Sequence, residues 1–332
     1  MKILYAGSPV ASALVLKNLI AFCNSDEGKA LDIQLAGVLT NPPSARGRKK
    51  DLIPTEVAAA AKENNLPLLE FEHLTAESRT AVAPLGADLL VSFDYGRIFG
   101  PKFLSLFALG GINLHPSALP KHRGCTPVPA CILAGEKELG ITVQKLALKT
   151  DEGDILAQSF IALDGTETTQ SLMDGDGKSS PVVDKGSELL ISVLKNYAAG
   201  KTEGTAQTGE SDYTPFLKKE DGLIDWKLCA QEIDRRIRAF TPWPLCYTGF
   251  NGVKLTVLKA VPGTEENNAL AGDAQPGTVL PYRKNVGIEI VCGNKTVLVA
   301  KQLQLQGKNA MDYKSFMNGA RNFTGTVLND KL

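Results

Sequence analysis

Strand-like and helix-like segments alternate through the N-terminal half of this sequence. Short apolar segments at 2–7, 32–40 and 88–93 are separated by segments of helical periodicity, such as 10–22 and 54–65. Strands that alternate with helices are typical of a mostly parallel sheet that helices cover on both faces. The pattern therefore predicts a doubly wound α/β domain, in which ligands bind beyond the carboxyl ends of the strands.

The pattern changes after residue 200. Residues 201–214 are polar, with scattered Gly and Thr and no apolar periodicity, which is typical of a linker. One helix-like segment and several short strand-like segments with Gly and Asn turns follow, and they favour a small OB-like β-barrel. We therefore predict an α/β domain over 1–200, a linker over 201–214 and a β-barrel domain over 215–332.

The composition of the chain limits which partners it can bind and in which compartment we expect it. Lys plus Arg and Asp plus Glu number 36 each, so any nucleic acid must bind through a local patch and not through a global field. The six cysteines form no CxxC pair and no secretory signal precedes them, so we expect a reduced, cytoplasmic protein without a metal site. No apolar stretch approaches the roughly 20 residues that a membrane span needs, so we expect no membrane partner.

A strand-like segment ends with two polar side chains at 110–116, Gly-Gly-Ile-Asn-Leu-His-Pro. Because side chains alternate faces along a strand, Asn113 and His115 point to the same side. The proline-rich residues that follow cannot continue a strand or a helix, and they predict a shaped surface loop. Two of the three histidines of the chain, His115 and His122, lie in this stretch, which favours a site.

Asp151 lies between the strand-like segments 140–148 and 154–163, which predict a hairpin connection with Gly153 at positive φ. With Asn113 and His115 it supplies an amide donor, an imidazole and a carboxylate, the groups that acyl transfer to an amine requires. The same residues also fit a turn-capping Asn, a buried His and an Asx turn. The residue types alone leave both interpretations open.

Four cations are concentrated in the predicted loop between the second strand and the next helix: Arg46, Arg48, Lys49 and Lys50. In a chain without net charge, this cluster predicts a local site for an anionic ligand. A solvated run of charges is the usual explanation for such a cluster. The length of the loop and its proline and glycine framing favour a functional loop instead.

The sequence resembles the methionyl-tRNA formyltransferase family over essentially its whole length. The family's Asn-x-His, followed by Pro-Ser-x-Leu-Pro-x-x-Arg-Gly, stands here as NLHPSALPKHRG at 113–124, and its Asp-x-Gly-Asp as DEGD at 151–154. The family usually has Pro-Arg-Trp-Arg-Gly where this sequence has Pro-Lys-His-Arg-Gly, so His122 stands in the place of a tryptophan. Further segments similar to the family lie, in the same order, at 2–9, 40–54, 87–101 and 224–244.

The resemblance implies a formyltransferase core, an OB-like domain and 10-formyltetrahydrofolate as the formyl donor, with no metal. It implies that Asn113 and His115 stabilise the oxyanion of a tetrahedral intermediate, while Asp151 supports His115 and proton transfer. The nucleophile would be the methionyl α-amine of charged initiator tRNA. We expect a monomer.

Two binding regions are expected beside these residues. We expect the folate donor to contact a proline loop and a strand end, where backbone amides and apolar walls can hold a flat ring. The expected contacts are Ser117, Ala118, Leu119, Pro120, Leu90, Phe93 and Tyr95. The resemblance implies that the basic loop with Arg46 binds the tRNA acceptor stem, with Arg48 at the unpaired end and Lys49 and Lys50 at phosphates.

Two other functions fit parts of the sequence. A nucleotide-sugar N-formyltransferase resembles this family in its core and its Asn-His-Asp set, but its acceptor pocket would not need a basic loop. An RNA-binding module would use the barrel alone. Such a module has no reason to keep Asn113, His115 and Asp151 at these spacings.

Overall fold

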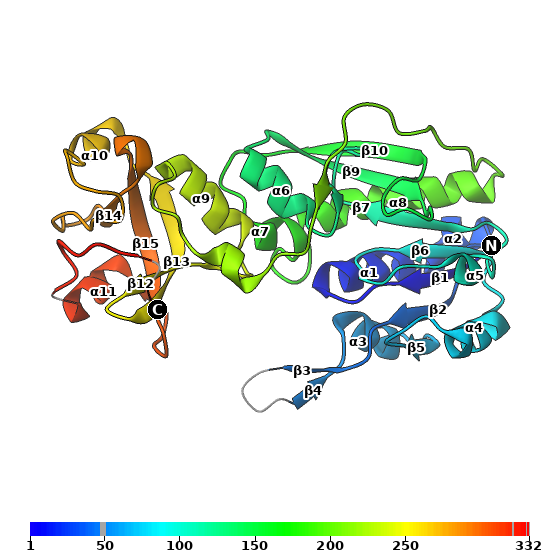
Figure 1. The fold of residues 1–332 in the computed structure, drawn as a ribbon. Helices are drawn as coiled ribbons and strands as arrows, with labels where there is room; N and C mark the ends of the chain where they lie inside the picture. Colours follow the sequence, from blue (N-terminus) through cyan, green and yellow to red (C-terminus); the bar gives the residue numbers. More distant parts are fainter. Residues whose placement is uncertain (47–50, 321, 330, 332) are drawn as a thin grey trace. The chain divides into compact units, whose positions relative to one another are not determined.

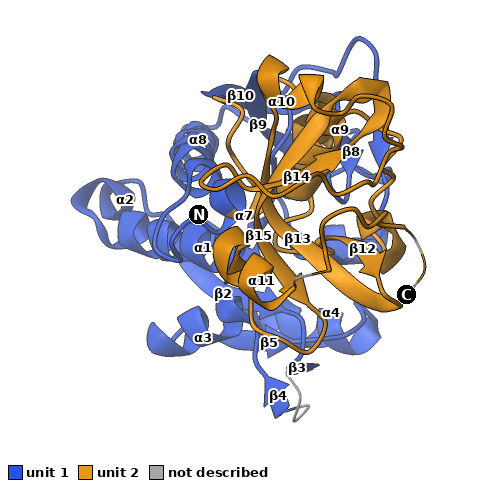
Figure 2. Cartoon of the chain, turned by 90° about the vertical axis from the view of Figure 1, so that its left-hand side faces the viewer, with its two compact units in different colours: residues 1–128, 137–163, 171–215 blue, residues 129–136, 164–170, 216–332 orange. Residues whose placement is uncertain are grey.

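The computed structural model describes residues 1–46, 51–320, 322–329 and 331. The predicted contacts Arg48, Lys49 and Lys50 lie outside the described residues. The chain divides into two compact units, which Figure 2 distinguishes by colour. Unit 1 consists of residues 1–128, 137–163 and 171–215, and unit 2 consists of residues 129–136, 164–170 and 216–332.

Unit 1 contains a mixed sheet with the strand order β10-β9-β7-β6-β1-β2-β5 (Figure 1). The pairs among β7, β6, β1, β2 and β5 are parallel, whereas β9 pairs antiparallel with both β7 and β10. The prediction of a mostly parallel sheet is therefore confirmed. The strands are β1 (Lys2–Ala6), β2 (Gln34–Thr40), β5 (Leu68–Glu70), β6 (Leu89–Ser92), β7 (Gly111–His115), β9 (Glu138–Lys145) and β10 (Ile155–Ala162).

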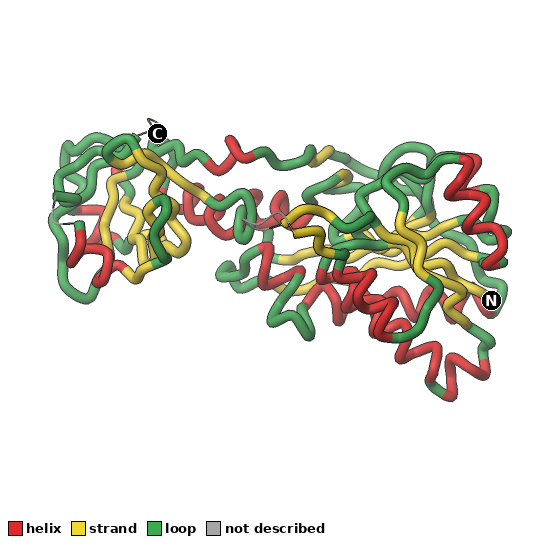
Figure 3. Tube along the Cα trace, turned by 90° about the horizontal axis from the view of Figure 1, so that it is seen from below, coloured by secondary structure: helices red, strands yellow, loops and turns green. Residues whose placement is uncertain are grey.

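Helices cover both faces of this sheet, as a doubly wound fold requires (Figure 3). Leu4 and Ala6 of β1 face an apolar cluster that includes Phe99 and Phe103. Tyr5 faces the other side, where its hydroxyl donates to the Ser12 carbonyl of α1 at 2.8 Å. Because both faces are buried, the central strands are almost continuously apolar.

Polar side chains cap the first turns of two helices, α3 (Glu56–Glu63) and α8 (Pro181–Ala198). Thr55 accepts from the Ala58 amide at 3.0 Å at the start of α3, and Ser180 accepts from the Val183 amide at 3.2 Å at the start of α8. The helices of unit 1 are α1 (Val10–Asn24), α2 (Asp26–Ala30), α3 (Glu56–Glu63), α4 (Ala76–Val82), the 3₁₀ helix η1 (Ala83–Leu85), α5 (Pro101–Leu104) and α8 (Pro181–Ala198). Helices α6 (Pro127–Ala134) and α7 (Thr169–Met173) each contain residues of both units.

Two short strand pairs complete unit 1. β3 (Ser44–Arg46) and β4 (Asp51–Ile53) form an antiparallel pair, which Figure 1 shows extending away from the main sheet. β8 (Arg123–Gly124) and β11 (Tyr213–Thr214) pair in parallel, although they lie far apart in the sequence. The second pair ties the segment 201–214 to the residues that follow the proline loop.

Unit 2 is built on an antiparallel sheet with the strand order β12-β13-β15-β14, to which β16 adds beside β15. Register shifts in the long β13–β15 pair and isolated bridges such as Thr278 to Val327 curl this sheet into a half-barrel. The predicted β-rich, OB-like class is confirmed. The strands are β12 (Cys246–Phe250), β13 (Val253–Pro262), β14 (Ile288–Val291), β15 (Val297–Leu305) and β16 (Met311–Asp312).

The amphipathic helix α9 packs its apolar face, including Ile233 and Ile237, against this sheet. Every helix in the described ranges is too short or too polar to cross a membrane. The helices of unit 2 are the 3₁₀ helix η2 (Lys219–Gly222), α9 (Ala230–Ala239), α10 (Glu265–Ala269), the 3₁₀ helix η3 (Gly293–Lys295) and α11 (Tyr313–Gly319).

All six cysteines are free thiols, and they differ in accessibility. Burial raises the pKa of Cys246 and of Cys292 to about 12, so both thiols stay protonated at neutral pH. We predict that an alkylating reagent leaves Cys246 and Cys292 unmodified in the folded protein and modifies them in urea, as measured by peptide mass spectrometry. The exposed Cys125 is the control for reagent access. Equal native labelling of all three thiols would contradict the burial described above.

Candidate active site

Asn113 and His115 lie on β7, which runs parallel to β6 and ends at the same edge of the sheet. Asn113 is half-buried, and His115 is buried with 4% of its surface exposed. Leu114 points the other way, toward α8, because a Cβ built on Gly186 of α8 would lie 2.8 Å from Leu114 Cδ2. Asn113 and His115 therefore share the face of β7 that is turned away from α8.

The two ring nitrogens of His115 have different partners. Nε2 lies 3.0 Å from the backbone carbonyl oxygen of His122. Because a carbonyl oxygen only accepts, Nε2 carries the hydrogen of this bond. Nδ1 lies 3.8 Å from Oδ2 of Asp151, an ion-pair distance that is longer than a hydrogen bond. Nδ1 is therefore the nitrogen that remains available for proton exchange.

Asp151 is held with its carboxylate toward His115. Its backbone adopts the left-handed conformation, with φ at 55°, which Asp tolerates better than most residues. Its Oδ2 accepts from the Gly124 amide at 2.9 Å, and its Oδ1 accepts from Nε2 of Gln144 at 2.7 Å. These partners belong to β8 and β9, so the carboxylate is oriented by other segments of the fold.

The loop of Asp151 is held in place by Gln207, from the segment that the sequence predicts to be a linker. Gln207 Nε2 donates to the carbonyl oxygens of Asp151 and Gly153, at 2.8 Å each. Arg123 in turn donates to Gln207 Oε1 through Nε at 3.1 Å and Nη2 at 2.8 Å. Sequence reasoning missed Gln144 and Gln207, because no motif connects Gln207 with a loop that lies 56 residues earlier.

The predicted hairpin of β9 and β10 is present, but the role expected of Gly153 is wrong. The positive φ belongs to Asp151, and Gly153 has an ordinary backbone conformation. A Cβ at Gly153 would lie 1.7 Å from the Lys145 carbonyl oxygen. Glycine is therefore needed here for close approach of two backbone segments, and not for a left-handed turn.

The proline loop 117–120 lies against β9. Thr142 Oγ1 donates to the Ser117 carbonyl at 2.7 Å, and the Leu119 amide donates to the same hydroxyl oxygen at 3.4 Å. Gly140 permits this contact, since a Cβ there would lie 2.3 Å from the amide nitrogen of Ala118. Leu119 is buried, whereas Ala118 and Pro120 are partly exposed. These contacts thus hold the loop in a fixed position against β9.

Leu90, Phe93 and Tyr95, at the end of β6, are packed into the interior. Leu90 and Tyr95 belong to the apolar cluster of unit 1, and Phe93 is 1% exposed. Tyr95 stacks on Phe99 with ring centroids 5.3 Å apart, and burial raises the pKa of its phenol to about 12. Their contact with a donor molecule stays a prediction.

Negative charge collects at this edge of the sheet. Asp94 lies two residues after the end of β6 and reaches solvent. The surrounding protein nevertheless desolvates its carboxyl group and Asp174 adds negative charge, which together raise the pKa of Asp94 to about 6. Desolvation and the charges of Asp151 and Asp94 also raise the pKa of the Cys125 thiol. No group of three or more potential metal ligands occurs among the described residues.

Of the predicted basic cluster, Arg46 alone lies within the described residues. Arg46 is the last residue of β3 and pairs in register with Asp51, the first residue of β4. Next to the cluster, Leu52 is 72% exposed and Ile53 is 41% exposed.

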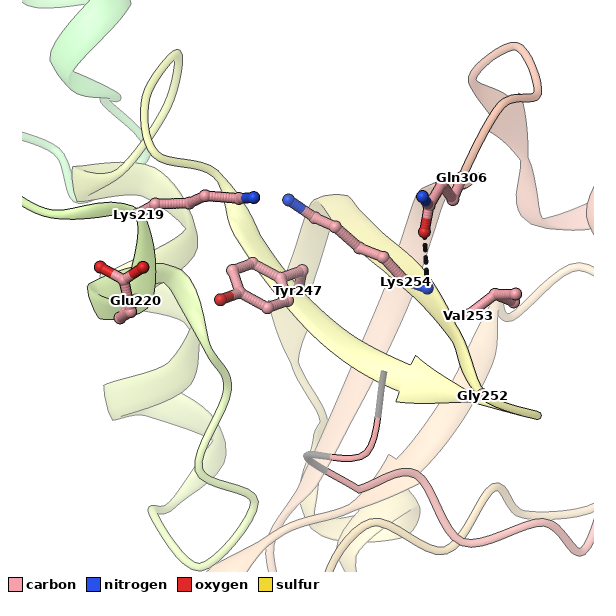
Figure 4. A pocket seen from close by; sticks show the side chains of 7 residues that line it. All are labelled: Lys219, Glu220, Tyr247, Gly252, Val253, Lys254 and Gln306. Atoms are coloured by element: carbon pink, nitrogen blue, oxygen red, sulfur yellow. Dashed lines mark hydrogen bonds between the residues drawn. The ribbon is translucent and has the colours of Figure 1, made fainter.

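Unit 2 has a groove of about 880 Å³ in which two lysine side chains converge (Figure 4). The ammonium group of Lys254 lies 4.1 Å from the ring centroid of Tyr247. Desolvation, and then the charge of Lys219, lower the pKa of Lys254. An anion between the two lysines would relieve this repulsion. The groove is lined by Lys219, Glu220, Tyr247, Gly252, Val253, Lys254 and Gln306.

Both units match known families. Residues 1–184 match the family described as Formyl transferase, and residues 217–321 match the family described as Formyl transferase, C-terminal domain. The chain is 42% identical to methionyl-tRNA formyltransferase of Treponema denticola, over 97% of this chain and 98% of the relative. It is 34% identical to the protein of the same name of Bacillus subtilis, over 98% of this chain and 97% of the relative.

Solved structures share the fold at lower identity. Methionyl-tRNA formyltransferase from Clostridium thermocellum superposes with a TM-score of 0.53 at 15% identity, covering 88% of this chain and 100% of that chain. WlaRD, a sugar 3N-formyl transferase, superposes with a TM-score of 0.61 at 20% identity, covering 93% of this chain and 99% of that chain. The two matched domains and the full-length relatives show that this chain belongs to the methionyl-tRNA formyltransferase family.

Proposed function

We propose that this chain transfers the formyl group of 10-formyltetrahydrofolate to the α-amine of methionyl initiator tRNA. The observation that carries the proposal is the pairing of Asn113 and His115 on one strand face, with the Asp151 carboxylate held 3.8 Å from His115 Nδ1. An amide donor, an imidazole and an oriented carboxylate are sufficient for direct attack by an amine, and no Ser or Cys nucleophile is needed.

The reaction proceeds through a tetrahedral intermediate. The α-amine attacks the formyl carbon while Nδ1 of neutral His115 takes a proton from it, and the carbonyl oxygen becomes an oxyanion that the Asn113 amide and the resulting imidazolium stabilise. The amine loses a proton, and N10 of the folate gains one as the C–N bond to the donor breaks. His115 exchanges these protons at Nδ1, because its Nε2 hydrogen is bound to a carbonyl. Asp151 stabilises the charged imidazole.

Donor binding is assigned to the edge between β6 and the proline loop. The loop residues Ser117, Ala118, Leu119 and Pro120 supply a fixed polar backbone, and Leu90, Phe93 and Tyr95 supply the apolar wall behind it. The two hydrogen bonds between Thr142 and the loop support this assignment, since a fixed loop loses little entropy when it holds a flat ring.

Binding of tRNA is assigned to two basic surfaces, one in each unit. The hairpin with Arg46, Arg48, Lys49 and Lys50 contacts the acceptor stem, where Arg48 reads the unpaired end. In unit 2, Lys219 and Lys254 converge on a groove, and a phosphate of the tRNA backbone is the ligand that suits them. We further propose that the enzyme acts as a monomer in the cytoplasm. Its catalytic domain would comprise residues 1–200, its linker 201–214 and its tRNA-binding domain 215–332.

The first test concerns the reaction and its acceptor. We predict that Asn113→Ala and His115→Ala each lower kcat by roughly two or more orders of magnitude, the usual loss for an oxyanion donor or an acid-base group. Formyl transfer to charged initiator tRNA and to a nucleotide-linked sugar amine is measured side by side, with circular dichroism as the control for folding. Transfer to the sugar amine alone would refute the tRNA assignment, and near-normal rates in both variants would refute the site.

The second test concerns the proline loop. A Cβ at Gly140 would lie 2.3 Å from the Ala118 amide nitrogen, so Gly140→Ala must displace the loop. We predict that this variant raises the KM for the folate donor about tenfold or more, whereas the KM for tRNA changes little. Gly319→Ala is the matched control, because nothing lies within 4 Å of a Cβ at that position. A variant with an unchanged donor KM would show that the loop does not bind folate.

The third test separates reading of the tRNA end from general attraction. We predict that Arg48→Ala reduces the preference for initiator over elongator tRNA. Lys49→Ala and Lys254→Ala should weaken binding of all tRNAs alike and lower the slope of log K against log salt by about one each. Binding is measured at several salt concentrations. Lys185→Ala is the control, because that exposed lysine already pairs with Glu188 at 2.9 Å. Unchanged salt slopes in both lysine variants would exclude phosphate contacts there.

A further inference from the structure

His122 has a left-handed backbone conformation, which is uncommon for residues other than glycine. It lies two residues after the proline loop, with φ at 54°, and its surroundings must favour this left-handed conformation. Its side chain is 11% exposed. The structure must therefore contain a specific contact that holds His122.

That contact is the carboxylate of Asp212. The backbone amide of His122 donates to Asp212 Oδ1 at 2.6 Å, and Nδ1 of the His122 ring donates to Oδ2 at 2.9 Å. One carboxylate thus binds both the main chain and the side chain of His122, across a sequence separation of 90 residues. Partial desolvation opposes ionisation of Asp212, but the hydrogen bonds from His122 outweigh it and lower the pKa.

Asp212 is itself placed by the strand pair that follows it. Tyr213 and Thr214 of β11 pair with Arg123 and Gly124 of β8, immediately after His122. Thr214 Oγ1 donates to the Arg123 carbonyl at 2.9 Å, which fixes the register of the two segments. The position of the carboxylate is therefore set by the backbone of unit 1 and not by a flexible side chain alone.

His122 contacts His115 through one atom, its backbone carbonyl oxygen. The His122 carbonyl oxygen accepts from His115 Nε2 at 3.0 Å, and its direction depends on the left-handed conformation that Asp212 maintains. We propose that Asp212 and His122 form a positioning pair that keeps the hydrogen of neutral His115 on Nε2 and presents Nδ1 to Asp151. Its catalytic consequence rests on the function proposed above, whereas its effect on His115 itself does not.

A purely structural role would give different results. If Asp212 only closed the loop, its loss would lower the melting temperature without changing which nitrogen of His115 carries the hydrogen. A positioning role changes the proton distribution of His115 and the pH profile of kcat, because this profile reports the groups that exchange protons in the bound complex. Asp212 contacts no substrate in the proposed mechanism, so the KM values should change little.

The test uses the full chain with Asp212→Ala, and with Glu210→Ala as the control at an exposed position of the same segment. The chain has only three histidines, so NMR of the imidazole nitrogens resolves each ring. We expect neutral His115 to carry its hydrogen on Nε2 in the wild type and to become a mixture of tautomers in Asp212→Ala. We expect kcat to fall about 10- to 100-fold with a shifted pH profile, as for a misplaced reacting group.

A second variant keeps the test decisive. In His122→Asn the new side chain tolerates positive φ and its amide can donate to Asp212, so neutral His115 should keep its hydrogen on Nε2, in contrast to Asp212→Ala. If Asp212→Ala does not fold, the His115 tautomer and the pH profile of kcat are measured in Asp212→Asn, whose side-chain oxygen still accepts a hydrogen bond but carries no charge. An unchanged His115 tautomer and pH profile in the folded Asp212 variant would overturn the proposal. A changed tautomer with unchanged kcat would support it and would count against the catalytic role of His115.

Discussion

The antiparallel pairing of β7 with β9 places Asn113 opposite Gln144 and His115 opposite Thr142. The same two residues of β9 also bind the neighbouring loops, since Gln144 donates to Asp151 and Thr142 donates to the Ser117 carbonyl. A slip of one residue would turn these side chains to the opposite face of the sheet. One strand register therefore brings the strand end, the proline loop and the Asp151 turn to a single place.

The apolar core maintains this register. Leu114, between Asn113 and His115, packs against Gly186 of α8, and Ile141 and Val143 of β9 are fully buried. Burial of each such side chain contributes about 1.5–3 kcal/mol, and a slipped register would expose it to solvent. The polar residues of the site are thus held by the apolar residues that alternate with them on the same strands.

A second set of constraints comes from a segment with little structure of its own. Residues 201–214 have no apolar periodicity, yet Gln207 binds the backbone of the Asp151 loop and Asp212 binds His122. Their polar composition suits these roles, because hydrogen bonds to backbone groups need amides and carboxylates and not apolar side chains. The segment therefore positions both the Asp151 loop and His122.

The sequence by itself determined the fold class and the location of the candidate chemistry. Apolar periodicity is a local property, so it predicted the mostly parallel sheet, the β-rich second unit and the shared facing of Asn113 and His115. Only the tertiary structure decided which backbone groups bind those side chains. The contacts of His115 with the His122 carbonyl, of Gly153 with Lys145 and of Asp212 with His122 depend on the approach of segments in space. No local pattern carries that information, because each contact depends on the fold of the residues between its partners.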